Sequence, residues 1–192
     1  MNILLGIGNP GRDYESTRHN IGHLLINELS NKYNTPLKPA KGDYLEANIE
    51  IEGERVKVVR SLVFMNNSGV VAKQLSALPD FLLKKFIVVL DDFALPLGRI
   101  KIRRGGSSGG HRGLESIIYA LGSARFPRLR IGIGPVEDDA VDFVLSGFTA
   151  EEIDTITESI KRAIVAVEIF VKEGIEKAMN YANQSKSYDR AL

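Results

Sequence analysis

Cysteine is absent from this chain of 192 residues, which excludes both a disulfide framework and a thiolate metal site. No apolar run approaches the ~20 residues that span a bilayer, so no membrane association is expected. Residues 1–5 lack the charged start of a signal peptide. We therefore expect a single domain over residues 1–192 that works in the reducing cytoplasm, with a frayed polar tail at about residues 184–192.

Basic and acidic residues are separated along the chain, although the net charge is only +1. Residues 99–130 hold eight lysines and arginines against the single acid Glu115, whereas residues 137–158 hold eight acids and no lysine or arginine. Such a distribution can create a basic face that binds a polyanion. It is also compatible with two ordinary solvated stretches.

Apolar positions follow strand and helix periods in alternation along the chain. Strands are expected at residues 2–7, 44–51, 55–59, 86–90, 99–103 and 129–133, the second and third of them forming a hairpin. Helices are expected at residues 20–33, 68–78 and 114–121, and from the capping-box pair Thr149 and Glu152 to Gly174. This order predicts an α/β fold, with one mixed, mostly parallel, twisted sheet and helices on both faces.

The first predicted turn, Gly-Ile-Gly-Asn-Pro-Gly at residues 6–11, formally matches the dinucleotide-binding pattern G-x-G-x-x-G. In that pattern a helix begins within the motif, so that its amides can hold a pyrophosphate. Here the polar stretch 12–18 comes before the helix. A tight turn at a strand end, which can also border an active site, therefore explains these glycines better than a nicotinamide or flavin site.

His19 and His23 have the i,i+4 spacing of a zinc-binding helix. No glutamate follows His19, so the H-E-x-x-H pattern fails and no metal is expected. His19 lies on a polar turn, from which its ring could reach a cleft, whereas His23 is expected to pack or to lie on the helix surface. Asp91 follows the apolar strand 86–90, where a carboxylate can serve catalysis or cap a turn.

Two further segments allow two interpretations each. The glycine-rich loop 105–113 leads into a helix, so its amides could cradle a phosphate, or it could be a flexible connection. The cations at residues 99–104 favour the phosphate. Residues 64–69 could simply begin a helix, or Asn66 could offer its amide to a substrate carbonyl.

Together these segments resemble the bacterial peptidyl-tRNA hydrolase family, in kind and in order. The family's Gly-x-Gly-Asn-Pro-Gly, Tyr and Thr-Arg-His-Asn correspond to residues 6–11, 14 and 17–20, and its Phe-Met-Asn-x-Ser-Gly to residues 64–69. Its Asp before Leu-Pro-x-Gly corresponds to Asp91, and its Arg-Leu-Arg-Ile-Gly-Ile-Gly to residues 128–134. Its Gly-Gly-His-Asn-Gly-Leu corresponds to residues 109–114, with Arg112 in place of the usual Asn.

The resemblance implies a role for each matching residue. His19 would be the general base that activates water, and Asp91 would orient its ring and stabilise the imidazolium. Asn66 would position the substrate and the water, and Asn9 would help to distinguish a blocked α-amino group from a free one. The residues implied to line the site for the end of the tRNA are Tyr14 and Phe64.

The resemblance also implies contacts with tRNA phosphates. The cations that would make them are Lys101, Arg103, Arg128 and Arg130. Arg112 cannot accept a hydrogen bond as an asparagine can, but its charge could bind a tRNA phosphate instead.

The activity implied is hydrolysis of the ester between a peptide and its tRNA, without metal or cofactor, by a cytoplasmic monomer. Its partners would be peptidyl-tRNA and the tRNA acceptor end, and its role would be to recycle tRNA released from stalled ribosomes, with the large subunit as a further partner. The alternative is an RNA-binding protein on the same scaffold that has lost catalysis. The joint presence of Asn9, His19, Asn66 and Asp91 argues against it, because RNA binding requires no His–Asp pair, and only Arg112 supports it.

Overall fold

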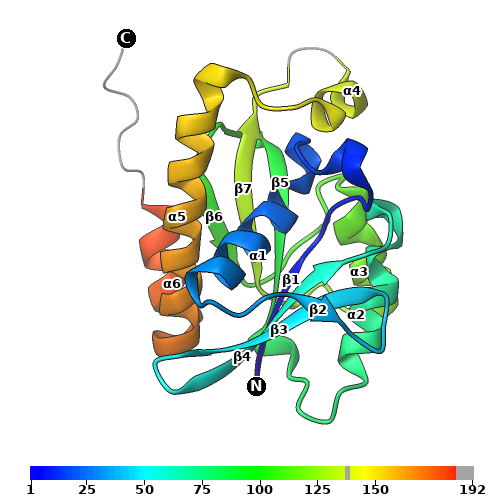
Figure 1. The fold of residues 1–192 in the computed structure, drawn as a ribbon, viewed down its shortest axis with the longest axis vertical. Coiled ribbons are helices and arrows are strands. Elements are labelled where there is room, and N and C mark those ends of the chain that lie inside the picture. The colour runs from blue at the N-terminus through cyan, green and yellow to red at the C-terminus, as the bar shows by residue number, and fades with distance from the viewer. Residues whose placement is uncertain (137–138, 185–192) are drawn as a thin grey trace.

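A seven-stranded mixed sheet forms the centre of the molecule (Figure 1). The computed structural model describes residues 1–136 and 139–184, so the tail predicted beyond Gln184 lies outside the described residues. The strand order is β2-β3-β4-β1-β5-β7-β6. The strands are β1 (Asn2–Gly6), β2 (Lys38–Pro39), β3 (Tyr44–Ile51), β4 (Glu54–Ser61), β5 (Phe86–Pro96), β6 (Ile100–Arg103) and β7 (Arg128–Gly134).

Parallel strands occupy the middle of the sheet and antiparallel strands its two edges. β1 runs parallel to β4 and β5, and β5 runs parallel to β7. The pairs β2–β3, β3–β4 and β6–β7 are antiparallel. The mixed sheet is confirmed, but the pairings divide evenly instead of being mostly parallel. The connections from β3 to β4 and from β5 to β6 are too short for a parallel crossover, so the chain reverses direction there.

Helices cover both faces of the sheet, as predicted (Figure 1). On β1, Leu4 packs with residues of the helices α1, α5 and α6, whereas Ile3 and Leu5 pack on the other face with residues of α2 and α3. The α-helices are α1 (Ile21–Lys32), α2 (Ser68–Ser76), α3 (Arg112–Leu121), α4 (Ala140–Leu145), α5 (Ala150–Glu173) and α6 (Ile175–Asn183). Across the described residues, no helix is both long and apolar enough to cross a membrane.

The predicted helix ends are confirmed where local chemistry fixes them. Thr149 and Glu152 form the capping box of α5, which ends before Gly174 at φ 87°. The short helix α4 was not predicted from the sequence. Its only evident start signal is Asp139, whose side chain accepts from two amides of the first turn, and none of its residues is buried.

The carboxyl ends of β1 and β5 place the residues of the candidate site. β1 leads through the turn at residues 7–17 into the 3-10 helix η2 (Arg18–Asn20), and α1 follows directly. Gly22 in the first turn of α1 allows a close approach to the sheet, because a Cβ there would lie 2.5 Å from the carbonyl oxygen of Ile7 and 2.6 Å from that of Val89. β5 extends beyond the predicted strand, so Asp91 lies within it.

Candidate active site

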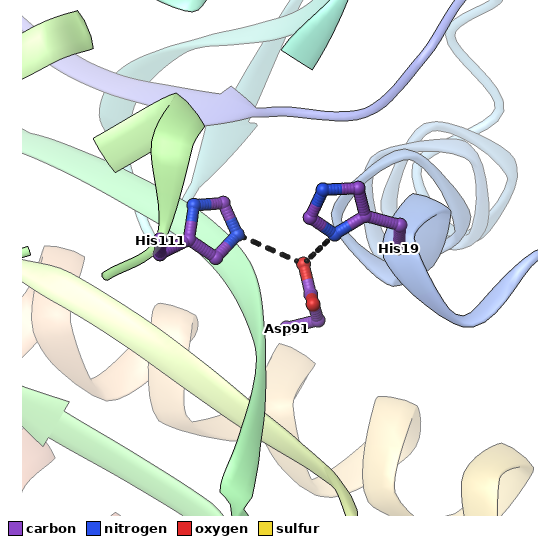
Figure 2. A group of neighbouring side chains, drawn as sticks. All are labelled: His19, Asp91 and His111. Atoms are coloured by element: carbon purple, nitrogen blue, oxygen red, sulfur yellow. Dashed lines mark hydrogen bonds and ion pairs between the residues drawn. The ribbon is translucent and has the colours of Figure 1, made fainter. Parts of the chain in front are cut away.

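His19 meets Asp91, which lies within β5 just beyond the carboxyl end of β1, although 72 positions separate them in the sequence (Figure 2). Nδ1 of His19 lies 2.9 Å from Oδ1 of Asp91. The Asp91 side chain is 1% exposed and that of His19 is 14% exposed. A carboxylate at Nδ1 keeps the proton on that nitrogen, which leaves Nε2 of the neutral ring able to accept one.

A second histidine, His111, approaches the same carboxylate oxygen (Figure 2). Its Nε2 lies 3.0 Å from Oδ1 of Asp91. Its Nδ1 accepts a hydrogen bond of 3.2 Å from the backbone N–H of Leu114 and so caps α3. Because Nδ1 is an acceptor, the neutral ring carries its proton on Nε2 and donates it to Asp91. The sequence analysis assigned no role to His111, although it lies in the family's Gly-Gly-His motif, three residues before the predicted helix 114–121.

The two histidines determine the charge of the carboxyl group between them. Burial alone would raise the pKa of Asp91, but the interactions with His111, and then those with His19, hold that pKa well below its ordinary range. Asp91 is therefore a carboxylate at neutral pH. It can accept from both rings and stabilise a positive charge on either.

A pocket of about 430 Å³ opens beside this cluster, between the sheet end and α4. One wall is apolar and exposed, since Val141 on α4 is 54% exposed and Leu145 is 39% exposed. The opposite side is polar. The lining residues are Asn9, His19, Met65, Asn66, Asp91, Phe93, Gly110, His111, Arg112, Ala140, Val141, Val144 and Leu145.

Asn9 is fixed in the pocket wall by hydrogen bonds from both sides. Its side-chain oxygen accepts from the backbone N–H of Met65 over 2.8 Å, and its own backbone N–H donates to Asn20 over 2.7 Å. Asn20 returns a hydrogen bond of 2.9 Å to the backbone carbonyl of Asn9. Because its oxygen is engaged, Asn9 offers the pocket its side-chain amide as a donor. Asn66, which is exposed, also lines the pocket, from the 3-10 helix η3 (Met65–Asn67).

Comparison with known proteins identifies the family. The family model described as peptidyl-tRNA hydrolase matches residues 3–190. The chain belongs to the peptidyl-tRNA hydrolase family. It is 45% identical to the peptidyl-tRNA hydrolase of Fervidobacterium nodosum, over 94% of this chain and 95% of that one. It is 41% identical to that of Thermodesulfovibrio yellowstonii, over 96% and 100% of the two chains.

A solved structure agrees over nearly the same length. The crystal structure of the peptidyl-tRNA hydrolase from Acinetobacter baumannii matches with a TM-score of 0.91 and 30% identity, covering 97% of this chain and 96% of that one. The fold described above is therefore the fold of this hydrolase family.

The catalytic and substrate-binding residues that the family resemblance implied lie together, with the exception of Tyr14 and Phe64. The pocket brings together Asn9, His19, Asn66, Asp91 and Arg112. Tyr14 and Phe64 are not among its lining residues. Their rings pack edge to face with centroids 6.2 Å apart, and the ring of Phe64, one residue before Met65, is 53% exposed.

The predicted phosphate-binding cations divide into two groups. Lys101 and Arg103 lie on the edge strand β6, half-buried and exposed respectively. Partial burial, and then the charges of Arg103, Arg99 and Arg130, lower the pKa of Lys101, as expected in a cluster of cations. Arg130 is also partly exposed and pairs with Asp92 over 2.9 Å.

Arg128 does not fit a phosphate contact. Its side chain is buried, and its guanidinium donates to the backbone carbonyls of Gly106, Ser107 and Ala124 at 2.6, 3.0 and 2.9 Å. Burial, and then the charge of Arg130, lower the pKa of Arg128 to about 10. The alternation of the strand correctly placed Arg128 opposite the apolar residues of β7, but the backbone of residues 106–107 and 124 encloses its guanidinium. Arg128 therefore anchors the loop from inside.

Among residues 1–136 and 139–184, one group of side chains could hold a metal ion: His19, Asp91 and His111. Their ligand atoms lie within 4.8 Å of one another. Both ring nitrogens lie at hydrogen-bond distance from one oxygen. The tautomer of His111 places a proton on the nitrogen that would have to bind a metal. The geometry therefore fits a hydrogen-bonded cluster better than a coordination sphere. His23 is not part of the cluster. It is buried, as the expectation that it packs in the interior requires, and does not lie on the helix surface.

Proposed function

We propose that this member of the peptidyl-tRNA hydrolase family cleaves the ester bond between a peptide and its tRNA, using a water molecule that His19 activates. The observation that carries the proposal is the hydrogen bond from Nδ1 of His19 to the buried carboxylate of Asp91. It assigns the proton to Nδ1 and leaves Nε2 as the base beside the pocket.

The reaction needs one proton carrier and no covalent intermediate. Nε2 of His19 takes a proton from water as the water oxygen attacks the ester carbonyl carbon. Asp91 stabilises the imidazolium that forms. When the tetrahedral intermediate collapses, the bond to the ribose oxygen of the tRNA breaks, and the imidazolium returns the proton to that oxygen. The products are a free tRNA hydroxyl and a peptide carboxylic acid, which releases its proton to the solvent and becomes a carboxylate.

Two side-chain amides can stabilise the charge that develops on the carbonyl oxygen. Asn66 lines the pocket from η3, and Asn9 lines it from the neighbouring turn, which is hydrogen-bonded to η3. A donor placed at that oxygen contributes about 3–4 kcal/mol to the transition state in favourable cases. The fixed amide of Asn9 also supports selection for a blocked α-amino group, because a donor pairs with a peptide carbonyl and not with a free ammonium.

The tRNA would lie on the basic side of the pocket. Lys101, Arg103 and Arg130 offer charge to its phosphates, and the exposed ring of Phe64, packed on Tyr14, offers a surface for an unpaired base. Arg112 begins α3 at the pocket edge, where it can reach a phosphate near the ester. In the cell this reaction would recycle tRNA from peptidyl-tRNA released by stalled ribosomes, in the cytoplasm and by a monomer.

The test is release of tRNA from N-acetyl-aminoacyl-tRNA and from free aminoacyl-tRNA, in isotopically labelled water and with EDTA present. The proposal predicts cleavage of the blocked substrate alone, with the label in the acyl carboxylate. Loss of the activity in EDTA would contradict the metal-free mechanism. Tight tRNA binding without any cleavage would favour the alternative, an RNA-binding protein that has lost catalysis.

A further inference from the structure

Arg18 is the residue before His19 and the first residue of η2. Its buried side chain reaches the start of α5. Its guanidinium makes a two-fold hydrogen bond with the carboxylate of Glu152, at 2.9 and 2.6 Å. The same group lies 4.6 Å from the ring centroid of Phe143 and 5.0 Å from that of Phe148. A planar guanidinium can do both at once, whereas a lysine ammonium cannot.

Further hydrogen bonds join residues 17–18 to residues 146–147, which lie between α4 and α5. Nε of Arg18 donates to Oγ of Ser146 over 3.2 Å, and its backbone N–H donates to the carbonyl of Ser146 over 2.9 Å. Thr17 forms an isolated antiparallel bridge with Gly147. The turn that carries His19 is thus bonded along residues 146–147, directly after α4.

Among the described residues, the helix α4 is otherwise held by Phe143 and Val144, which pack partly buried against the core. It has six residues, none of them buried, and so short a helix is unstable alone. One side carries Phe143, which lies over the Arg18 guanidinium. The other side carries Val141, Val144 and Leu145, which form the apolar wall of the pocket.

We infer that Arg18 is a positioning residue that fixes the apolar wall of the pocket relative to His19. Through Glu152, Phe143 and Ser146 it holds α4 against η2, so the wall for the acyl chain and the base share one anchor. This inference rests on the proposed function, in which the acyl group occupies the pocket. Loosening the anchor displaces the wall and the base together, and misplacement by about 1 Å can cost 100-fold in rate.

The experiment compares the full-length wild type with Arg18→Lys, Glu152→Gln and the double variant. The control is Lys57→Met, which removes another buried cation, paired with Glu46 over 2.6 Å in the β3–β4 hairpin, away from the pocket. The readouts are kcat and KM for N-acetyl-aminoacyl-tRNA, amide hydrogen exchange of residues 140–147, and the tautomer of His19 from nitrogen NMR. All are measured at a temperature where every variant is folded by circular dichroism.

The expected result is a fall in kcat of about 10- to 100-fold with a higher KM in Arg18→Lys and Glu152→Gln, and no further loss in the double variant. In both single variants, amide hydrogen exchange of residues 140–147 becomes faster, and His19 no longer holds a single Nδ1–H tautomer. The Lys57→Met control keeps the wild-type kinetic constants, amide hydrogen exchange and His19 tautomer. A folded Arg18→Lys protein with wild-type kinetics would overturn the inference, and so would slower kinetics with unchanged exchange and tautomer. If the wild type cleaves nothing, the proposed function fails, and exchange and tautomer still decide the role of Arg18.

Discussion

Nε2 of His111 donates to Oδ1 of Asp91 over 3.0 Å, while the other nitrogen of the same ring caps α3 by accepting from a backbone amide. One side chain therefore joins a helix start to the carboxylate that orients His19. The two contacts can be separated by mutation. Asparagine is also a good helix cap, but its shorter side chain cannot bridge to Asp91.

His111→Asn is expected to lower kcat about tenfold and to lower the free energy of unfolding by about 1.5–3 kcal/mol, because the cap remains while one hydrogen bond to a charged group is lost. His111→Ala is expected to lose about 1 kcal/mol of stability in addition, through the missing cap. Steady-state kinetics and urea unfolding of the two variants distinguish these effects. Wild-type kcat in His111→Asn would remove His111 from the catalytic cluster.

The stability of the protein is expected to fall in acid through His23. This ring is 2% exposed, and neither of its nitrogens has a hydrogen-bond partner among the described residues. Burial, and then the charge of Arg60, lower the pKa of His23 from 6.5 to about 3. As the pH falls below 6.5, His23 becomes protonated in the unfolded chain but stays neutral in the folded protein. Stability is therefore lost from pH 6.5 down to about pH 3.

Between pH 7 and pH 4.5 this loss amounts to about 2–3 kcal/mol, on the scale of 1.36 kcal/mol for each pH unit. His23→Leu removes the titration without leaving a hydrogen-bond partner unpaired, so its unfolding free energy should change less over the same interval. Urea unfolding of both proteins at the two pH values measures the difference. Equal pH dependence in the two proteins would show that His23 can be protonated in the folded state.

The salt dependence of tRNA binding is expected to distinguish Arg103 from Arg128. Arg103→Gln should reduce the slope of log K against log salt by about 1, because one phosphate contact is lost. Arg128→Gln should leave that slope unchanged and instead lower the free energy of unfolding by about 2–4 kcal/mol, because loop carbonyls lose a charged donor. Binding titrations at several salt concentrations, with denaturation curves, test both statements. A reduced slope in Arg128→Gln would place Arg128 back among the phosphate contacts.

Arg112→Asn is expected to raise KM at moderate salt and to change kcat by no more than a few-fold, because a phosphate contact near the ester strengthens binding without entering the chemistry. The effect should shrink as salt screens the charge. Arg125→Asn, which removes an exposed arginine just beyond the other end of α3, is the matched control. Equal changes in the two variants would assign the effect to overall charge and not to the position of Arg112.

The fold could be predicted from the sequence because its signals are local. Residues 86–90 form a continuous apolar run, and the pair Thr149 and Glu152 marks a helix start without reference to the rest of the chain. The hairpin of β3 and β4 was predicted, but the antiparallel direction of β6 and the presence of α4 and α6 were missed. They depend on short connections and on contacts with η2 that no periodicity records.

The site was predicted in part, for a different reason. The pairing of His19 with Asp91 came from the family resemblance, and the structure places the two side chains in contact. His111 was missed because only the fold brings the start of α3 to the end of β5. The contacts of Arg128 with the loop carbonyls were missed, because strand alternation gives the face of a side chain and not what covers it. The anchoring contacts of Arg18 reach Glu152, 134 positions away in the sequence, so no local pattern could indicate them.

The central proposal is that His19, oriented by Asp91, acts as the general base. The most direct test is the single-turnover rate of N-acetyl-aminoacyl-tRNA cleavage by wild type and by His19→Ala, with the enzyme in excess and tRNA affinity measured alongside. The proposal predicts unchanged tRNA affinity and a rate about 100- to 10,000-fold lower in His19→Ala. A folded His19→Ala protein that cleaves the ester at close to the wild-type rate would contradict it.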